Sequence, residues 1–363
     1  MTMHPKTIAL PFVGLVLLAV GCGRRSDSGT PDGTLDPNAL PFASAPAAPA
    51  ASSATPAVSS PAAPTASRFS PRASASVAAT GSVVHDAAAR TAFSKSPAKG
   101  TTKRLATAPC IGAIAIDADT GRVLLEENAD ALALPASMTK MMLLLLLQER
   151  IEAGTIATND LVAVSKRAFS TGGSQVYLDP RESFPVEDLV YALMIQSAND
   201  AAVALAEHAA GSCEAMVALM NQRAAELGMR NTHFESVHGL PAPAGEPNDV
   251  TTPRDMAILS AELCSHPDAL RYTSTAYRVF RPAKPFEMRT HNPLLQRGTP
   301  GCDGLKTGYT KYAGYSIAAS VVRGGRRVVV VQMGSPDKDS RNAKLDARLN
   351  AAFTALATQP PSP

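Results

Sequence analysis

The run from Met141 to Leu147, which consists only of methionine and leucine, constrains the fold more than any other stretch of the chain. A helix that is apolar on every side belongs in the interior of a domain. The run is also too short to cross a bilayer, which takes about 20 apolar residues. We therefore expect a buried helix that begins near Pro135, ends near Gly154 and has the rest of the folded chain packed around it.

A serine and a lysine, Ser137 and Lys140, lie three positions apart at the front of this helix. Side chains with that spacing lie on one face and can touch. An apolar environment disfavours the charged form of lysine and lowers its pKa, and a neutral amine beside a hydroxyl is a base beside a nucleophile. Taken alone, such a short pattern usually means a capping serine and a surface lysine. Its weight here comes from two further motifs.

The first 22 residues have the features of an export signal. A short basic start precedes an apolar run from Thr7 to Val20, which is shorter than a membrane span. Small residues before Cys22 resemble a bacterial lipobox, in which the cysteine is lipidated and becomes the new N-terminus. An ordinary cleaved signal and an uncleaved anchor are the alternatives. We expect an exported lipoprotein on the periplasmic or cell-envelope side, and Gly23 indicates the outer membrane if the source is Gram-negative.

Residues 23–104 are rich in Ala, Pro, Ser and Thr and contain few large apolar side chains. A segment of this composition cannot bury enough surface to offset its chain entropy, so we expect a disordered tether. The remainder predicts one folded domain over residues 105–358, followed by a short tail at 359–363.

Composition excludes several functions. The net charge of +3 arises from 34 basic and 31 acidic residues, and no basic stripe with interleaved aromatics indicates nucleic-acid binding. The sequence has neither a Cys-x-x-Cys nor a His-Glu-x-x-His motif, so we expect no metal site. Apart from Cys22, four cysteines could pair in three ways in an oxidising compartment: Cys110, Cys213, Cys264 and Cys302.

The order of predicted elements indicates an α+β domain. Two short strands, near 110–117 and 123–125, precede a helical middle part with a helix junction at 196–200. Three strands and a helix at about 337–357 come last. We therefore expect a central antiparallel sheet flanked by helices, with both ends of the domain in one sheet and an all-helical sub-region between them.

Three short motifs occur in a fixed order: Ser137-x-x-Lys140, Ser197-x-Asn199 and Lys306-Thr307-Gly308. Together they resemble the serine–lysine signature of penicillin-binding proteins and β-lactamases. Their flanking residues are most similar to the low-molecular-mass penicillin-binding proteins, the serine-type D-alanyl-D-alanine carboxypeptidases. The resemblance covers about 106–357 and implies the β-lactamase/D,D-peptidase-like fold of the wider β-lactamase/transpeptidase-like superfamily.

The resemblance also implies roles for the first two motifs. Ser137 would be the nucleophile that forms a covalent ester, and a neutral Lys140 would accept its proton. Ser197 would relay a proton to the leaving amine, and Asn199 would hold the substrate amide and orient Lys140.

The third motif would bind the substrate. Lys306 and Thr307 would hold its terminal carboxylate, and Gly308 would let its backbone lie along the strand edge as an added strand. The backbone N–H groups of Ser137 and Tyr309 would form the oxyanion hole. His291 lies where some members of the family carry a more basic residue, which would soften carboxylate binding.

The resemblance therefore implies hydrolysis of the terminal D-Ala-D-Ala bond of a peptidoglycan stem peptide through an acyl-enzyme. β-Lactams would acylate the same serine, and no metal or organic cofactor is needed. A D,D-endopeptidase that cleaves cross-links would use the same site and remains the nearest alternative. A D,D-transpeptidase and a non-catalytic wall-binding lipoprotein are further ones. A class A β-lactamase is disfavoured because the sequence has no Glu-x-x-Leu-Asn motif between the second and third fragments.

Overall fold

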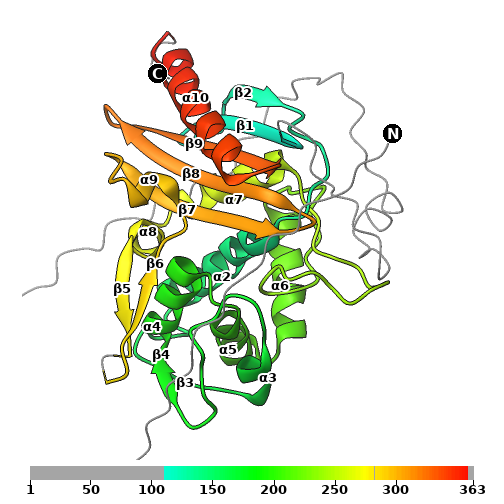
Figure 1. Ribbon diagram of the computed structural model, residues 1–363, viewed down its shortest axis with the longest axis vertical. Helices are drawn as coiled ribbons and strands as arrows, with labels where there is room; N and C mark the ends of the chain where they lie inside the picture. The colour runs from blue at the N-terminus through cyan, green and yellow to red at the C-terminus, as the bar shows by residue number, and fades with distance from the viewer. Residues whose placement is uncertain (1–109, 282, 359–363) are drawn as a thin grey trace, which may run out of the picture. The chain divides into compact units, whose positions relative to one another are not determined.

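The computed structural model describes residues 110–281 and 283–358, and a five-stranded antiparallel sheet organises them (Figure 1). The strand order is β2-β1-β9-β8-β7. Because β1 pairs with β9, the first and last strands of the domain share one sheet, as expected. The strands span Gly112–Asp117 (β1), Val123–Glu127 (β2), Cys302–Thr310 (β7), Gly314–Arg323 (β8) and Arg326–Ser335 (β9).

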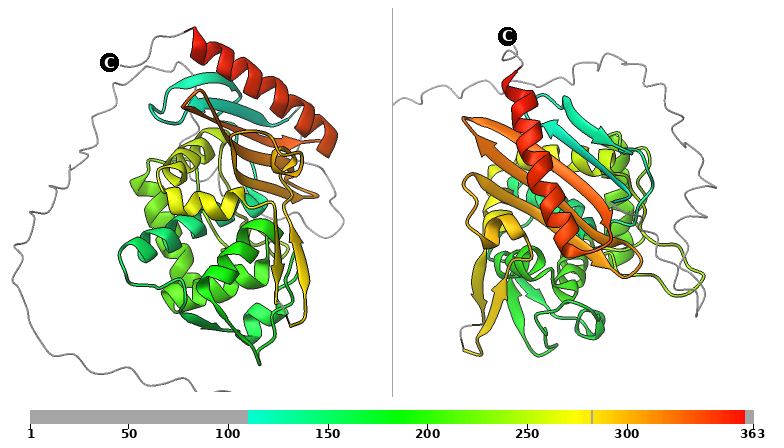
Figure 2. Two further views of the ribbon diagram at one scale, coloured as in Figure 1. Left: turned by 90° about the vertical axis from the view of Figure 1, so that its left-hand side faces the viewer. Right: turned by 45° about the horizontal axis from the view of Figure 1, so that its top comes forward.

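The two faces of the sheet bury different clusters, which follows from the two-residue period of a strand. On β9, Val329 and Val331 belong to the main core, whereas Val328 and Val330 face a second cluster. Helix α10, Lys338–Ala357, covers that second face (Figure 2). Its buried apolar residues form one stripe, Leu345, Leu349, Ala352 and Leu356.

On the opposite face, α7 (Pro253–Cys264) packs against β1, β8 and β9, and α2 (Lys140–Glu152) packs against α7. Helix α2 also packs against α5 (Asn199–Ala210), α6 (Cys213–Glu226) and α8 (Pro267–Ser274), and every residue from Lys140 to Gln148 is buried. Burying a leucine side chain contributes roughly 1.5–3 kcal/mol. The run of five leucines therefore makes α2 the centre of the core, and the expected buried helix is confirmed.

The helices around α2 have ordinary start signals. Ser212 caps α6 by accepting from Ala215 N, and Thr252 caps α7 by accepting from Asp255 N. The helices are α3 (Lys166–Ser170), α4 (Val186–Tyr191), α5 (Asn199–Ala210), α6 (Cys213–Glu226), α7 (Pro253–Cys264), α8 (Pro267–Ser274) and α9 (Pro293–Gln296). A 3₁₀ helix, η1 (Ala136–Thr139), precedes α2, and a π-helical segment, η2 (Ala192–Gln196), follows α4.

The helical sub-region also carries two small sheets that the sequence analysis did not anticipate. Strand β3 (Leu161–Ala163) pairs with β4 (Ser183–Pro185), and β5 (Tyr277–Phe280) pairs with β6 (Phe286–Arg289). These strands have only three or four residues, too few to show a clear alternation. The α+β architecture is confirmed, and the sub-region is helical with two two-stranded sheets at its edge.

Several expectations lie outside the described residues: the signal at 1–22 with Cys22, the tether at 23–104 and the tail at 359–363. Within the described part, the four cysteines Cys110, Cys213, Cys264 and Cys302 are all free. No single helix there is both long enough and apolar enough to cross a membrane; α5 and α6 reach the limits only when counted together, across an 82° bend.

Candidate active site

The expected pairing of Ser137 and Lys140 is present, but they do not share one α-helix. Ser137 lies in η1, and α2 begins at Lys140. The Lys140 Nζ atom is 3.2 Å from Ser137 Oγ. Two carbonyl oxygens accept from the same Nζ at 2.7 Å, the side-chain Oδ1 of Asn199 and the backbone O of His238. The contact with His238 was not anticipated, because a backbone carbonyl leaves no mark in the sequence.

The electrostatic setting of Lys140 favours a neutral amine. Its side chain is fully buried, and burial lowers its pKa well below the ordinary value. The positive charge of Lys306 acts in the same direction, while Asp249 and Asp200 oppose it. A neutral amine has two N–H donors, which match the two carbonyl acceptors, so its lone pair is left for the Ser137 hydroxyl.

Ser197 reaches the site through an irregular backbone. It directly follows η2 and adopts a left-handed conformation, with φ of 62°. Left-handed φ is uncommon outside glycine and is a recurrent feature of functional sites. The Ser197 hydroxyl is buried, and among the described residues it has no hydrogen-bond partner. A substrate group would satisfy this hydroxyl.

Asn199, the first residue of α5, is held on three sides. Besides accepting from Lys140, its side chain donates through Nδ2 to Gly172 O at 2.8 Å. Its backbone N donates to Ser174 O at 2.7 Å. Asn199 therefore contacts Lys140 directly through Oδ1, while its amide nitrogen is engaged with Gly172 O.

The third motif lies on β7, an edge strand of the main sheet, beside η1. Lys306 is buried, and burial lowers its pKa to about 7. Its Nζ donates to Thr307 O at 3.1 Å. A Cβ on Gly308 would lie 2.6 Å from Pro135 O, so glycine is needed for η1 to approach the strand. Tyr309 is exposed and stacks on Tyr315, with ring centroids 4.2 Å apart.

A cavity of about 320 Å³ collects these groups. Of the residues predicted from the sequence, it is lined by Ser137, Ser197, His291, Thr307, Gly308 and Tyr309. Lys140, Asn199 and Lys306 lie buried behind this lining. The sequence analysis missed the other lining residues: Ser174, Gln296, Tyr315, Lys338 and Arg341.

The missed Arg341 supplies a cation to this cavity, and His291 does not. Burial lowers the pKa of Arg341 to about 10, so it stays charged at neutral pH, and its Nε and Nη2 atoms donate to Asn342 Oδ1 at 3.1 and 2.8 Å. Desolvation and the charges of Lys306, Lys338 and Arg341 lower the pKa of His291 to about 4, so it is neutral. One signal could have identified Arg341: it lies four residues before Leu345, on the buried stripe of α10.

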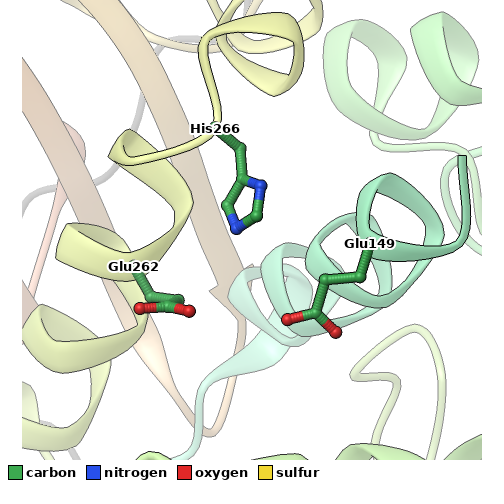
Figure 3. Close-up of side chains that lie close together, drawn as sticks. All are labelled: Glu149, Glu262 and His266. Atoms are coloured by element: carbon green, nitrogen blue, oxygen red, sulfur yellow. The ribbon is translucent and has the colours of Figure 1, made fainter. Parts of the chain in front are cut away.

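One further cluster of possible metal ligands lies elsewhere among the described residues, formed by Glu149, Glu262 and His266 (Figure 3). Arg223 donates to both of these glutamates, at 2.8 and 2.6 Å. His266 Nδ1 lies 2.9 Å from Oε1 of Glu152, a glutamate outside the cluster. The cluster is thus an ion-pair network with its own cation.

Comparison with known proteins agrees with this geometry. Residues 100–337 match the peptidase S11 family, described as D-alanyl-D-alanine carboxypeptidase. The chain is 38% identical over 274 residues to D-alanyl-D-alanine carboxypeptidase DacF of Bacillus subtilis, covering 75% of this chain and 69% of that one. It is 36% identical over 259 residues to DacA of Escherichia coli, covering 68% of this chain and 62% of that one.

The chain is also similar in fold to a solved structure of a protein with a bound drug. Penicillin-binding protein D2 from Listeria monocytogenes, in its ampicillin-bound form, superimposes with a TM-score of 0.60 at 27% identity. The match covers 69% of this chain and 100% of that chain.

Proposed function

The chain belongs to the D-alanyl-D-alanine carboxypeptidase family, and from that premise we propose that Ser137 is the acylated nucleophile of a serine-type D,D-carboxypeptidase. The substrate is the D-alanyl-D-alanine end of a peptidoglycan stem peptide in the cell envelope. β-Lactams are covalent inhibitors at the same serine. The observation that carries the assignment is the buried Lys140 amine, with two carbonyl acceptors and one serine hydroxyl around its nitrogen.

Acylation follows from this arrangement. Ser137 Oγ attacks the carbonyl carbon of the penultimate D-alanine while its proton passes to the neutral Lys140 amine. The negative charge that develops on the carbonyl oxygen is stabilised by the backbone N–H groups of Ser137 and Tyr309; one such donor is worth about 3–4 kcal/mol. The proton that Lys140 took from Ser137 is delivered to the departing D-alanine amine through the unpartnered Ser197 hydroxyl, which gives up one proton and receives another, so that Lys140 is neutral again. Water then hydrolyses the ester, with Lys140 again moving the proton.

The carboxylate of the terminal D-alanine binds at the far side of the cavity. Thr307 and Arg341 line the cavity and offer a hydroxyl and a positive charge, and Lys306, buried behind them, offers a second positive charge. Of the two cations, Arg341 is the better anchor for a carboxylate, since it remains charged at pH 7, whereas burial lowers the pKa of Lys306 to about 7. Neutral His291 contributes at most a hydrogen bond.

Release of free D-alanine tests this function. The full chain is incubated with a pentapeptide ending in D-Ala-D-Ala and, separately, with a cross-linked peptide dimer. We expect D-alanine from the pentapeptide with the wild type and none with Ser137→Ala. Cleavage of the dimer alone would assign the endopeptidase activity instead. No product from either substrate, together with no labelling by penicillin, would indicate a wall-binding protein.

We also propose that Cys22 carries a lipid, with residues 23–104 as the spacer between that lipid and the catalytic domain. The motif before Cys22 supports this proposal. In cells fed a clickable fatty acid, the wild type is expected to incorporate label and Cys22→Ser to incorporate none. Equal labelling of both would refute lipidation at this cysteine. If only the wild type is labelled, separating the inner from the outer membranes of a Gram-negative host locates the labelled protein.

A further inference from the structure

The segment 172–178 contributes Ser174 to the lining of the active-site cavity and also holds Asn199 in place. The carbonyl oxygens of Gly172 and Ser174 accept from the side chain and the backbone of Asn199, respectively. Ser174 itself lines the cavity, and its hydroxyl donates to Gln196 O at 2.7 Å. The position of this segment therefore determines where the Asn199 side chain meets Lys140.

A buried carboxylate accepts hydrogen bonds from backbone N–H groups of the same segment. Asp200 follows Asn199 in α5 and is fully buried. It accepts from Val176 N and from Leu178 N, each at 3.1 Å, and from Ala201 N at 2.9 Å. Asp200 thus ties the segment to the start of α5.

An arginine from a distant part of the chain donates hydrogen bonds to two backbone carbonyl groups of this segment. Arg281, at the end of β5, donates through Nη1 to Val176 O and through Nη2 to Tyr177 O, both at 2.6 Å. It also pairs with Glu182, at 2.9 Å. Its guanidinium lies about 5 Å from the ring centroids of Phe184 and Phe280.

The backbone at both ends of this contact is held in an unfavourable conformation. Tyr177 has φ of 56° and Arg281 has φ of 53°. Non-glycine residues keep a left-handed conformation only where their surroundings determine it. The hydrogen bonds from Arg281 to Val176 O and Tyr177 O hold both residues in this conformation. They also join the hairpin β5–β6 to segment 172–178.

We propose that Arg281 is a positioning residue for the reaction. By fixing the carbonyls of Val176 and Tyr177, it keeps segment 172–178 where its own carbonyls orient Asn199, the hydrogen-bond partner of the base Lys140. Arg281 touches none of the reacting groups and acts only through this segment. The inference rests on the proposed function, because it assigns a purpose to the geometry of the Lys140 site.

The fork of the guanidinium is essential to this role. Arginine can serve two carbonyls and a carboxylate at once, whereas lysine is a single point of charge on a flexible stem. Displacing reacting groups by about 1 Å can cost around 100-fold in rate. We therefore expect Arg281→Lys and Arg281→Met to lower the first-order acylation constant about 10- to 100-fold. Binding of the β-lactam before acylation is expected to be unchanged, because the carboxylate-binding residues lie on β7 and α10.

The hairpin offers a matched control. Arg278, which lies on β5 three residues before Arg281, forms an ion pair with Asp188 at 2.7 Å, and its guanidinium lies 4.2 Å from the centroid of the Tyr191 ring. It resembles Arg281 in its interactions, but none of these contacts reaches segment 172–178. Arg278→Met is therefore expected to acylate at the wild-type rate.

A fluorescent penicillin measures both constants in the full-length variants by rapid mixing over a range of concentrations. Thermal unfolding is recorded alongside. We expect both Arg281 variants to acylate slowly with unchanged initial binding. Arg278→Met is expected to acylate at the normal rate. Gly173→Ala provides a second perturbation, since its Cβ would lie 2.6 Å from Asn199 Nδ2, and it should show the same pattern.

The inference is overturned if the Arg281 variants acylate as fast as Arg278→Met. It is also overturned if their acylation and initial binding fall together in proportion to the loss of thermal stability. A wild type that fails to label would refute the proposed function instead, so the two failures can be told apart.

Discussion

Replacing Gly308 by alanine would separate the nucleophile from the substrate-binding strand. A Cβ at this position would lie 2.6 Å from Pro135 O, 3.2 Å from Met138 Cγ and 3.4 Å from Ala136 Cβ. Ordinary contacts begin near 3.4 Å, so the backbones must part by about 0.8 Å. Pro135 O accepts from Met138 N within η1, at 3.1 Å, so the displacement falls directly on the turn that carries Ser137.

We expect Gly308→Ala to lower the acylation rate much more than the folding stability. Overpacking of this kind costs roughly 1–3 kcal/mol of folding free energy, which the domain can tolerate. A displacement approaching 1 Å at the reacting atoms costs about 100-fold in rate. Gly308→Ala should therefore remain folded and acylate with penicillin about 100-fold more slowly than the wild type.

Rapid-mixing acylation with a fluorescent penicillin, together with a thermal unfolding curve, tests this expectation. A Gly308→Ala protein that stays folded and labels as fast as the wild type would show that the close approach of η1 to β7 is not needed for the reaction.

Three further predictions concern charge and packing. Because burial lowers the pKa of Lys306 to about 7, its charge is lost as the pH rises through that value. The pH profile of kcat/KM for D-alanine release should therefore decline above pH 7, and this decline should vanish in Lys306→Arg; an identical profile would contradict the assignment. Arg341→Ala should lower kcat/KM about 10- to 100-fold, as expected for a charge-assisted hydrogen bond of about 1.5–3 kcal/mol, and steady-state kinetics with unchanged values would refute carboxylate binding there. Leu145→Ala should reduce the free energy of unfolding by about 2–5 kcal/mol in a denaturant titration, and a loss well below about 1 kcal/mol would contradict its place in the core.

The sequence predicted the parts of the fold that rest on long, regular patterns. The apolar run of α2 indicated burial without reference to the rest of the chain, and the five strands of the main sheet followed from short apolar segments and the turn residues between them. The order of the three motifs then indicated which segments meet. Lys140, Ser137 and Asn199 do come together as that order implies.

Features that depend on contacts between distant segments could not be predicted. Ser137 lies in a 3₁₀ turn because η1 packs against Gly308, which is 171 positions further along the chain. The left-handed Ser197 ends a π-helical segment, a rare form with no clear sequence signature. The hold of Arg281 on Tyr177 depends on the hairpin β5–β6, whose strands are too short to recognise.

The identity of the acylated residue tests the central claim most directly. The full chain is treated with penicillin, digested and mapped by mass spectrometry. The account predicts one penicilloyl group, on the peptide that contains Ser137, and none in Ser137→Ala or in Lys140→Ala at short reaction times. An adduct on Ser197 or on any other residue, or an unchanged adduct in Ser137→Ala, would contradict it.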